Sequence, residues 1–168
     1  MSKKRAVFIG LIIFVVLGYV SCTRFQRDFY IGKLPKQIDI TETVFISDGF
    51  CGAAVFKLSD AALAAIKMQG LTFFETTLES RNVTENPWGV TEPSSRYGKW
   101  KETPFPPERG NEMPALAGLS CVESRQRDIV KPIQSHSAQN GSYYTETISG
   151  AELLVIPKLG IVVYSFFD

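Results

Sequence analysis

The residues best suited to covalent chemistry are three cysteines, Cys22, Cys51 and Cys121, and a single histidine, His136. Cys22 ends the N-terminal apolar run, which leaves Cys51 and Cys121 as an even pair in the rest of the chain. In an oxidising compartment such a pair is most simply a disulfide. The bridge would close a loop of about 70 residues and would stabilise the fold by roughly 4 kcal/mol, by lowering the entropy of the unfolded chain. We therefore expect a disulfide between Cys51 and Cys121.

The rival interpretation is a hydrolase in which Cys51 is the nucleophile and His136 is its base. A thiol becomes a nucleophile when a neighbouring imidazole or a helix N-terminus lowers its pKa. Cys51 instead precedes a predicted strand in DGFCGAAVFKL (residues 48–58), and His136 lies in QSHSAQNGS (residues 134–142), a polar stretch typical of a surface loop. We therefore expect no catalytic residues and no enzymatic activity, and the Cys51/His136 hydrolase is the less favoured alternative.

Motifs for metals, cofactors and nucleic acids are missing from the sequence. One histidine and scattered cysteines give no CxxC or HxxxH spacing for zinc, and the acidic residues follow no calcium-loop pattern. The sequence contains no phosphate loop ending in GK[ST] and no GxSxG elbow. Lys and Arg number 18 against 17 Asp and Glu, a balance that leaves no basic face for phosphates. We expect no metal, no cofactor and no nucleic-acid partner.

The N-terminal segment carries the strongest targeting signal. Residues 1–5, MSKKR, are basic, and residues 6–20, AVFIGLIIFVVLGYV, are uncharged and apolar. With the two residues that follow, this run would rise about 25 Å as a helix, slightly less than the roughly 30 Å of a hydrocarbon core. A short basic head before an apolar run is also the pattern of a secretion signal. We expect residues 6–22 to associate with a membrane and the later residues to face an extracytoplasmic space, the cell envelope or periplasm.

Three interpretations of residues 1–22 stay open. They are an uncleaved membrane anchor, a cleaved signal peptide, and a lipoprotein signal in which Cys22 is acylated and becomes the new N-terminus. Ser21 before Cys22 resembles the end of bacterial lipoprotein signals, although Tyr19 stands where such signals usually carry leucine. A helix buried inside a soluble domain is less favoured, because no polar face interrupts the run.

The rest of the chain predicts one α+β domain. TETVFIS and GAAVFKL carry the β-branched and aromatic residues typical of strands, on either side of a DGFCG turn. Ser59 can cap a helix that Gly70 would end. Near the C-terminus two apolar runs flank a turn at Gly160 and predict a hairpin covered on both faces. We expect a small antiparallel sheet of roughly four to six strands with the main helix on one face.

The predicted organisation has three parts: an anchor or signal, a tether, and a single domain. The anchor or signal is residues 1–22, the tether is residues 23–40, and the domain is residues 41–168 with a Pro-rich loop over residues 82–114. Strands are predicted over residues 41–47, 52–58, 141–149, 151–157 and 160–168; residues 71–80 are ambiguous between strand and helix, and residues 114–124 suggest a short helix.

A recognition surface is suggested by one stretch of the Pro-rich loop, SRYGKWKETPFPPERG (residues 95–110). Arg96, Tyr97, Trp100 and Phe105 combine rings with a cation, which suits sugars, peptides or anionic polymers. The alternative is that the rings plug the edge of the core, since Trp and Tyr are most often substantially buried.

These signals predict a membrane-anchored or exported envelope protein that acts as a non-catalytic binding or accessory module. Its partners would be the membrane, through residues 6–22, and a protein or envelope polymer. The alternative is an inhibitor or immunity-type protein that sequesters a partner enzyme, which would look the same in sequence.

Overall fold

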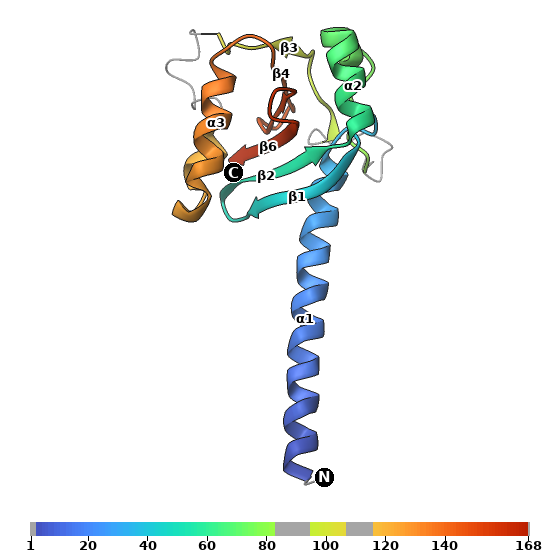
Figure 1. Ribbon diagram of the computed structural model, residues 1–168, viewed down its shortest axis with the longest axis vertical. Coiled ribbons are helices and arrows are strands. Elements are labelled where there is room, and N and C mark those ends of the chain that lie inside the picture. The colour runs from blue at the N-terminus through green and yellow to red at the C-terminus, as the bar shows by residue number, and fades with distance from the viewer. Residues whose placement is uncertain (1–2, 83–94, 107–115, 168) are drawn as a thin grey trace.

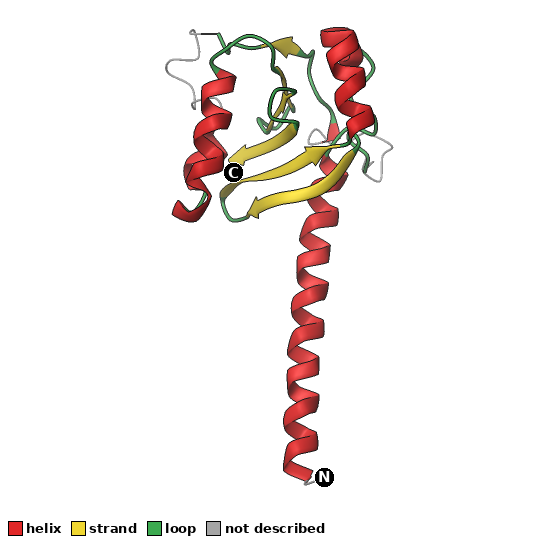
Figure 2. Cartoon of the chain, in the orientation of Figure 1, coloured by secondary structure: helices red, strands yellow, loops and turns green. Residues whose placement is uncertain are grey.

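An antiparallel sheet of six strands organises the domain, and the computed structural model describes residues 3–82, 95–106 and 116–167, with side chains from Leu11 onward. The spatial order of the strands is β1-β2-β6-β5-β4-β3, and every neighbouring pair is antiparallel. The strands are β1 (Ile40–Ser47), β2 (Cys51–Leu58), β3 (Lys101–Glu102), β4 (Tyr143–Glu146), β5 (Glu152–Ile156) and β6 (Ile161–Phe167). The predicted α+β class with an antiparallel sheet is thus confirmed (Figure 2).

Helices cover both faces of the sheet, so the domain has three layers (Figure 1). The α-helices are α1 (Lys3–Lys33), α2 (Asp60–Gln69) and α3 (Arg127–Ser137), and the short 3-10 helices are η1 (Gly70–Phe74), η4 (Ala117–Cys121) and η5 (Ser124–Gln126). The end of α1, α2 and η1 pack on one face, and η4 and α3 pack on the other. The sequence analysis placed a helix on one face only.

The two-residue period of the strands divides the apolar residues between two cores. In β2, Ala54 and Phe56 face the core under α1 and α2, whereas Ala53 and Val55 face the core under η4 and α3. All five residues of β5 are buried, as expected for a strand covered on both faces. This explains why the C-terminal strands are apolar at almost every position.

The local predictions around β1, β2 and α2 are confirmed. β1 and β2 form the expected hairpin, with two irregularities in its register. Ser59 caps α2, where its Oγ accepts a hydrogen bond from the Ala62 N–H at 3.1 Å. Gly70 follows the helix at φ 58°, a backbone conformation that glycine adopts without strain. β5 and β6 form the second expected hairpin, turning at Gly160 with φ 65°.

The segment expected to be a tether, residues 23–40, is instead part of the domain. α1 continues without a break to Lys33, and Tyr30, Leu34 and Ile38 are buried in the core. Tyr97 fixes this end of the helix, because its hydroxyl donates a hydrogen bond to the Lys33 carbonyl at 2.5 Å. The N-terminal half of α1 extends away from the domain (Figure 1).

Among the side chains from Leu11 onward, no helix is both long enough and apolar enough to span a bilayer. The first part of the apolar run, residues 6–10, lies outside the described side chains.

The second correction concerns α3, where the sequence analysis expected a polar surface loop around His136. Residues 127–137 form a helix, with His136 in its last turn and Pro132 inside it. Proline in a helix removes a backbone donor, which argues against a helix locally. Val130 and Ile133, however, lie three residues apart and are both buried against the sheet. Burial of these two side chains against the sheet stabilises the helix despite Pro132.

Candidate functional site

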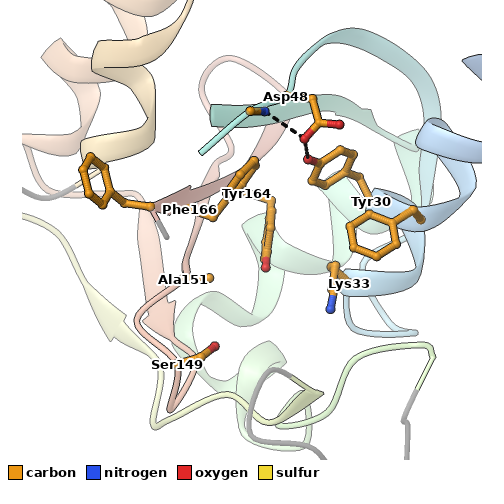
Figure 3. A pocket seen from close by; sticks show the side chains of 10 residues that line it. Tyr30, Lys33, Asp48, Ser149, Ala151, Tyr164 and Phe166 are labelled. Carbon is orange, nitrogen blue, oxygen red and sulfur yellow. Dashed lines mark hydrogen bonds between the residues drawn. The ribbon is translucent and has the colours of Figure 1, made fainter. Parts of the chain in front are cut away.

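A pocket lies where α1 reaches the sheet, and we call it the α1 pocket (Figure 3). It has a volume of about 350 Å³. Three parts of the chain build it: the end of α1, the β1–β2 turn, and β6 with the loop before β5. The pocket is lined by Phe29, Tyr30, Lys33, Asp48, Gly49, Ser149, Ala151, Tyr164, Phe166 and Phe167.

Aromatic rings form one wall of the α1 pocket. Tyr164 and Phe166 are alternate residues of β6, so both side chains point to the same face of the sheet. Tyr30 of α1 stacks on Phe166 with ring centroids 5.6 Å apart, and its ring lies 6.1 Å from that of Tyr164. Tyr30 and Tyr164 are buried, so this wall is fixed before any ligand arrives.

A carboxylate is held at the edge of this wall by three donors. The Tyr30 hydroxyl donates to Asp48 Oδ1 at 2.7 Å, and the Gly49 N–H donates to the same oxygen at 3.0 Å. Gln26 Nε2 donates to Asp48 Oδ2 at 3.3 Å. Asp48 thereby ties the β1–β2 turn to α1, which gives this carboxylate a positioning role.

Lys33 supplies the positive charge of the α1 pocket. Its side chain is half-buried, and its Nζ lies 5.1 Å from the centroid of the Phe29 ring. Within the part of the chain that the structure describes, the Lys33 ammonium forms no ion pair. An apolar pocket with one unpaired cation at its edge suits a ligand that joins an apolar group to an anionic one.

A second cavity of about 350 Å³ lies beside η1 and is lined by Leu71, Phe74, Glu75, Leu78, Tyr97, Gly98, Lys99 and Trp100. Its rings Phe74, Tyr97 and Trp100 are buried in the same core as Tyr30 and Tyr164, so burial of the rings does not distinguish the two cavities. We favour the α1 pocket as the site because its polar groups converge from separate elements onto one aromatic wall.

The structure corrects the recognition surface expected in the Pro-rich loop. Trp100 is 3 % exposed, its Nε1–H donates to the Thr77 carbonyl at 3.0 Å, and its ring stacks on Phe74 at 4.2 Å. Tyr97 is equally buried, and this burial, followed by the influence of Tyr164, raises its pKa well above 10. These two rings are structural, as in the alternative stated for them above.

The other two residues of that predicted surface lie elsewhere. Arg96 is exposed near Glu79, with Nε 4.0 Å from a carboxylate oxygen. Phe105 packs on Tyr144 with centroids 4.1 Å apart, in the core on the opposite face of the sheet from Tyr97 and Trp100. The four residues therefore form no common surface. The rest of the Pro-rich loop, residues 83–94 and 107–115, lies outside the described residues.

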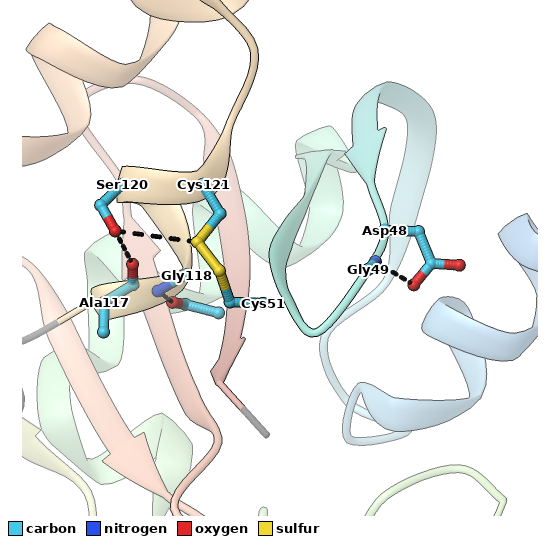
Figure 4. Close-up of a disulfide and its surroundings, with 8 residues drawn as sticks. Asp48, Gly49, Cys51, Ala117, Gly118, Ser120 and Cys121 are labelled. Atoms are coloured by element: carbon cyan, nitrogen blue, oxygen red, sulfur yellow. Dashed lines mark hydrogen bonds between the residues drawn. A yellow bond between two sulfur atoms is a disulfide. The ribbon is translucent and has the colours of Figure 1, made fainter.

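Cys51 and Cys121 form the expected pair, with sulfurs at bonding distance and Cα atoms 5.9 Å apart (Figure 4). Cys51 begins β2 and Cys121 ends η4, so the bridge holds η4 against the sheet. η4 approaches closely, because a side chain at Gly118 would collide with the Gly52 carbonyl oxygen. Gly118 N–H also donates to Ser165 Oγ at 3.1 Å.

The remaining predicted residues stand apart from the α1 pocket. Cys22 is a free, exposed cysteine on α1. His136 is half-buried on α3. The described residues contain no cluster of His, Cys, Asp and Glu side chains with the number and spacing to hold a metal ion.

The sequence analysis did not identify the α1 pocket. Phe29, Tyr30 and Lys33 fall in the segment that was expected to be a tether, and Asp48 in a segment interpreted only as a turn. The spacing of Tyr164 and Phe166 on one face of a strand was a usable signal, but nothing local pairs them with α1.

Comparison with known proteins gives no relative. No family model matches the chain, and no curated protein and no solved structure is significantly similar to it.

Proposed function

We propose that this protein is a membrane-attached binding module, held at a bilayer by residues 6–22, with a domain that acts without catalysis in the cell envelope. The observation that carries the proposal is the bare apolar surface of α1. Its large side chains are exposed over more than two turns: Leu11 59 %, Phe14 76 %, Leu17 60 % and Tyr19 71 %. A helix that is hydrophobic on all sides needs an apolar environment, which a bilayer supplies.

Two further features support an extracytoplasmic domain. A short basic head, Lys3 to Arg5, precedes the apolar run, which is the pattern of a secretion signal whose N-terminus stays in the cytoplasm. The Cys51–Cys121 pair at disulfide distance suits an oxidising compartment. The form we propose is attachment by the uncleaved segment. Acylation of Cys22 after cleavage and release of the domain as an exported protein are the alternatives.

A binding role is favoured over the Cys51/His136 hydrolase because the nucleophile of that hydrolase is occupied. The Cys51 sulfur is at bonding distance from Cys121 and so is not a thiolate that His136 could activate. The ligand we propose for the α1 pocket is an amphiphile with an apolar body against Tyr30 and Phe166 and an anionic group beside Lys33.

Photolabelling of the full chain in phosphatidylcholine vesicles tests this proposal. One preparation contains a diazirine-bearing fatty acid, and the other contains a diazirine-bearing phosphatidylcholine. We expect both probes to label residues 11–20 and only the fatty acid to label β6. The substitution Lys33→Gln should lower the labelling of β6 several-fold, whereas Lys36→Gln, at a nearby exposed lysine, should not.

Peptide mapping by mass spectrometry separates the outcomes. If neither probe labels residues 11–20, attachment to the bilayer is wrong. If β6 is labelled equally in the wild-type chain and in Lys33→Gln, the anionic ligand is wrong even though the attachment stands.

A further inference from the structure

The β1–β2 turn presents one apolar side chain almost entirely to solvent. Phe50 is 90 % exposed, although it follows a turn that is fixed on both sides. Asp48 binds Gln26 and Tyr30 of α1, and Cys51 is paired with Cys121. Single exposed apolar side chains are common on protein surfaces, so the position of this ring relative to α1 decides what it could contact.

We propose that this turn is a second bilayer contact, in which Phe50 enters the headgroup layer of the membrane that holds the apolar half of α1. The inference rests on the proposed function, because it takes the bilayer attachment of residues 6–22 as given. It adds that the domain has a defined orientation relative to the bilayer and that the β1–β2 turn contacts the lipid headgroups.

The register of α1 sets the height of the turn above the hydrocarbon core. Asp48 bonds to Gln26, which lies four residues beyond Cys22 and six beyond Val20. At 1.5 Å per residue Gln26 lies about 6–9 Å beyond the end of the apolar run, and Tyr30, the closer partner of Asp48, lies about 12–15 Å beyond it. The headgroup layer on each side of a bilayer is roughly 5–7 Å thick. The turn therefore lies at or just beyond the outer boundary of this layer, and a Phe50 side chain directed towards the apolar run would reach into it.

The continuous helix α1 fixes the position of the turn relative to the apolar segment. α1 is one helix from Lys3 to Lys33, and its residue Tyr30 is both buried in the core and bonded to Asp48. The β1–β2 turn lies at the end of the domain that faces the N-terminal half of α1 (Figure 1). The helix thus carries the turn towards the bilayer.

The residues of α1 at the same height have the chemistry of a bilayer interface. Phe25, at the level of Gln26, is 74 % exposed, and Phe29, one turn farther from the apolar run, is 49 % exposed. Arg24 and Arg27 are exposed beside them, and cations at this depth are attracted to lipid phosphates. Two carboxylates lie nearby: Asp48 already accepts three hydrogen bonds from the protein, and Asp28, exposed on α1, offsets part of the charge of the two arginines. This match of rings and cations favours a headgroup layer over a protein partner.

Tryptophan scanning of the full chain in vesicles tests the inference. Three substitutions are compared: Phe50→Trp at the turn, Phe14→Trp in the apolar run, and Met68→Trp on α2, where the native side chain is also exposed. Wild-type chain gives the background from Trp88 and Trp100. We expect lipids brominated near the glycerol to quench Phe50→Trp several-fold more strongly than Met68→Trp.

The outcomes distinguish this inference from the proposal on which it rests. Quenching of Phe14→Trp by deeply brominated lipids with no quenching of Phe50→Trp would overturn the second contact and leave the attachment standing. Absence of quenching at Phe14 as well would overturn the attachment, and the second contact with it. Unchanged melting temperatures of the variants would show that the domain stays folded in each.

Discussion

Trp100 and Tyr97 show that aromatic residues among cations can form a recognition surface or can be part of the core. The two cases have the same pattern in a sequence. Both residues lie among Arg and Lys in a loop, which is the composition of a recognition surface. In the structure their polar tips bind main-chain carbonyls, those of Thr77 and Lys33, and their rings fill the core beneath the sheet. A buried aromatic side chain whose polar tip is hydrogen-bonded to the main chain connects the segments that it contacts. Here it ties the loop to α1 and η1.

Replacement of Trp100 should therefore affect stability. We expect Trp100→Ala to lower the free energy of unfolding by about 3–5 kcal/mol, because it removes the ring that stacks on Phe74. Trp100→Phe should cost less, since a ring remains and the main loss is the hydrogen bond to Thr77. Denaturant unfolding measures both. The matched control is Phe50→Ala, at an exposed ring, where we expect a change of less than about 0.5 kcal/mol. Equal costs at the two sites would contradict this account.

At the scale of elements, hairpins and one helix could be predicted because their determinants lie within a few residues. Ser59 and Gly70 bracket α2, and Gly160 turns β5 into β6. The end of α1 and α3 could not be predicted in this way. Charged residues obscure the helical pattern at the end of α1. Pro132 and a polar C-terminal end obscure it in α3. In both, buried residues that contact distant strands outweigh local propensity.

The α1 pocket was beyond sequence reasoning for the same physical reason. β2 pairs with β6, which brings the first hairpin beside the last strand although more than a hundred residues separate Asp48 from Tyr164. Only this pairing places Tyr164 and Phe166 opposite Tyr30. No local pattern specifies a long-range strand pairing of this kind, whereas the Cys51–Cys121 pair could be proposed because cysteine chemistry limits the partners.

The pair of Cys51 and Cys121 holds η4 against β2, so its removal should lower the stability of the fold. Cys51 and Cys121 are 70 positions apart, so their bridge restricts a long loop of the unfolded chain. We expect the double substitution Cys51→Ser and Cys121→Ser to lower the free energy of unfolding by about 4 kcal/mol. Denaturant unfolding of the oxidised wild type against the variant measures the difference. Cys22→Ser is the control and should change little, because its side chain is exposed and unpaired. Equal stability of all three proteins would show that the bridge does not form.

For the whole molecule, the decisive feature is that a single helix joins the apolar segment to the core. A flexible tether would leave the orientation of the domain undefined, whereas α1 has no break between Leu11 and the buried Tyr30. Under the proposed attachment, the orientation of the α1 pocket and of the β1–β2 turn relative to a bilayer follows from helix geometry, at 1.5 Å and one fixed rotation per residue.

Arg27→Pro separates the two parts of this helix without touching the core. Proline at position 27 removes the backbone hydrogen bond to residue 23 and kinks the helix, three residues before Tyr30 is buried. We expect the domain to unfold at nearly the same denaturant concentration, while the lipid quenching of Phe50→Trp falls to the level of Met68→Trp. Arg27→Ala is the control, since it removes the same charge and keeps the helix. If Arg27→Ala loses the quenching to the same extent, then attraction of the guanidinium to phosphates positions the turn, and the continuity of α1 does not.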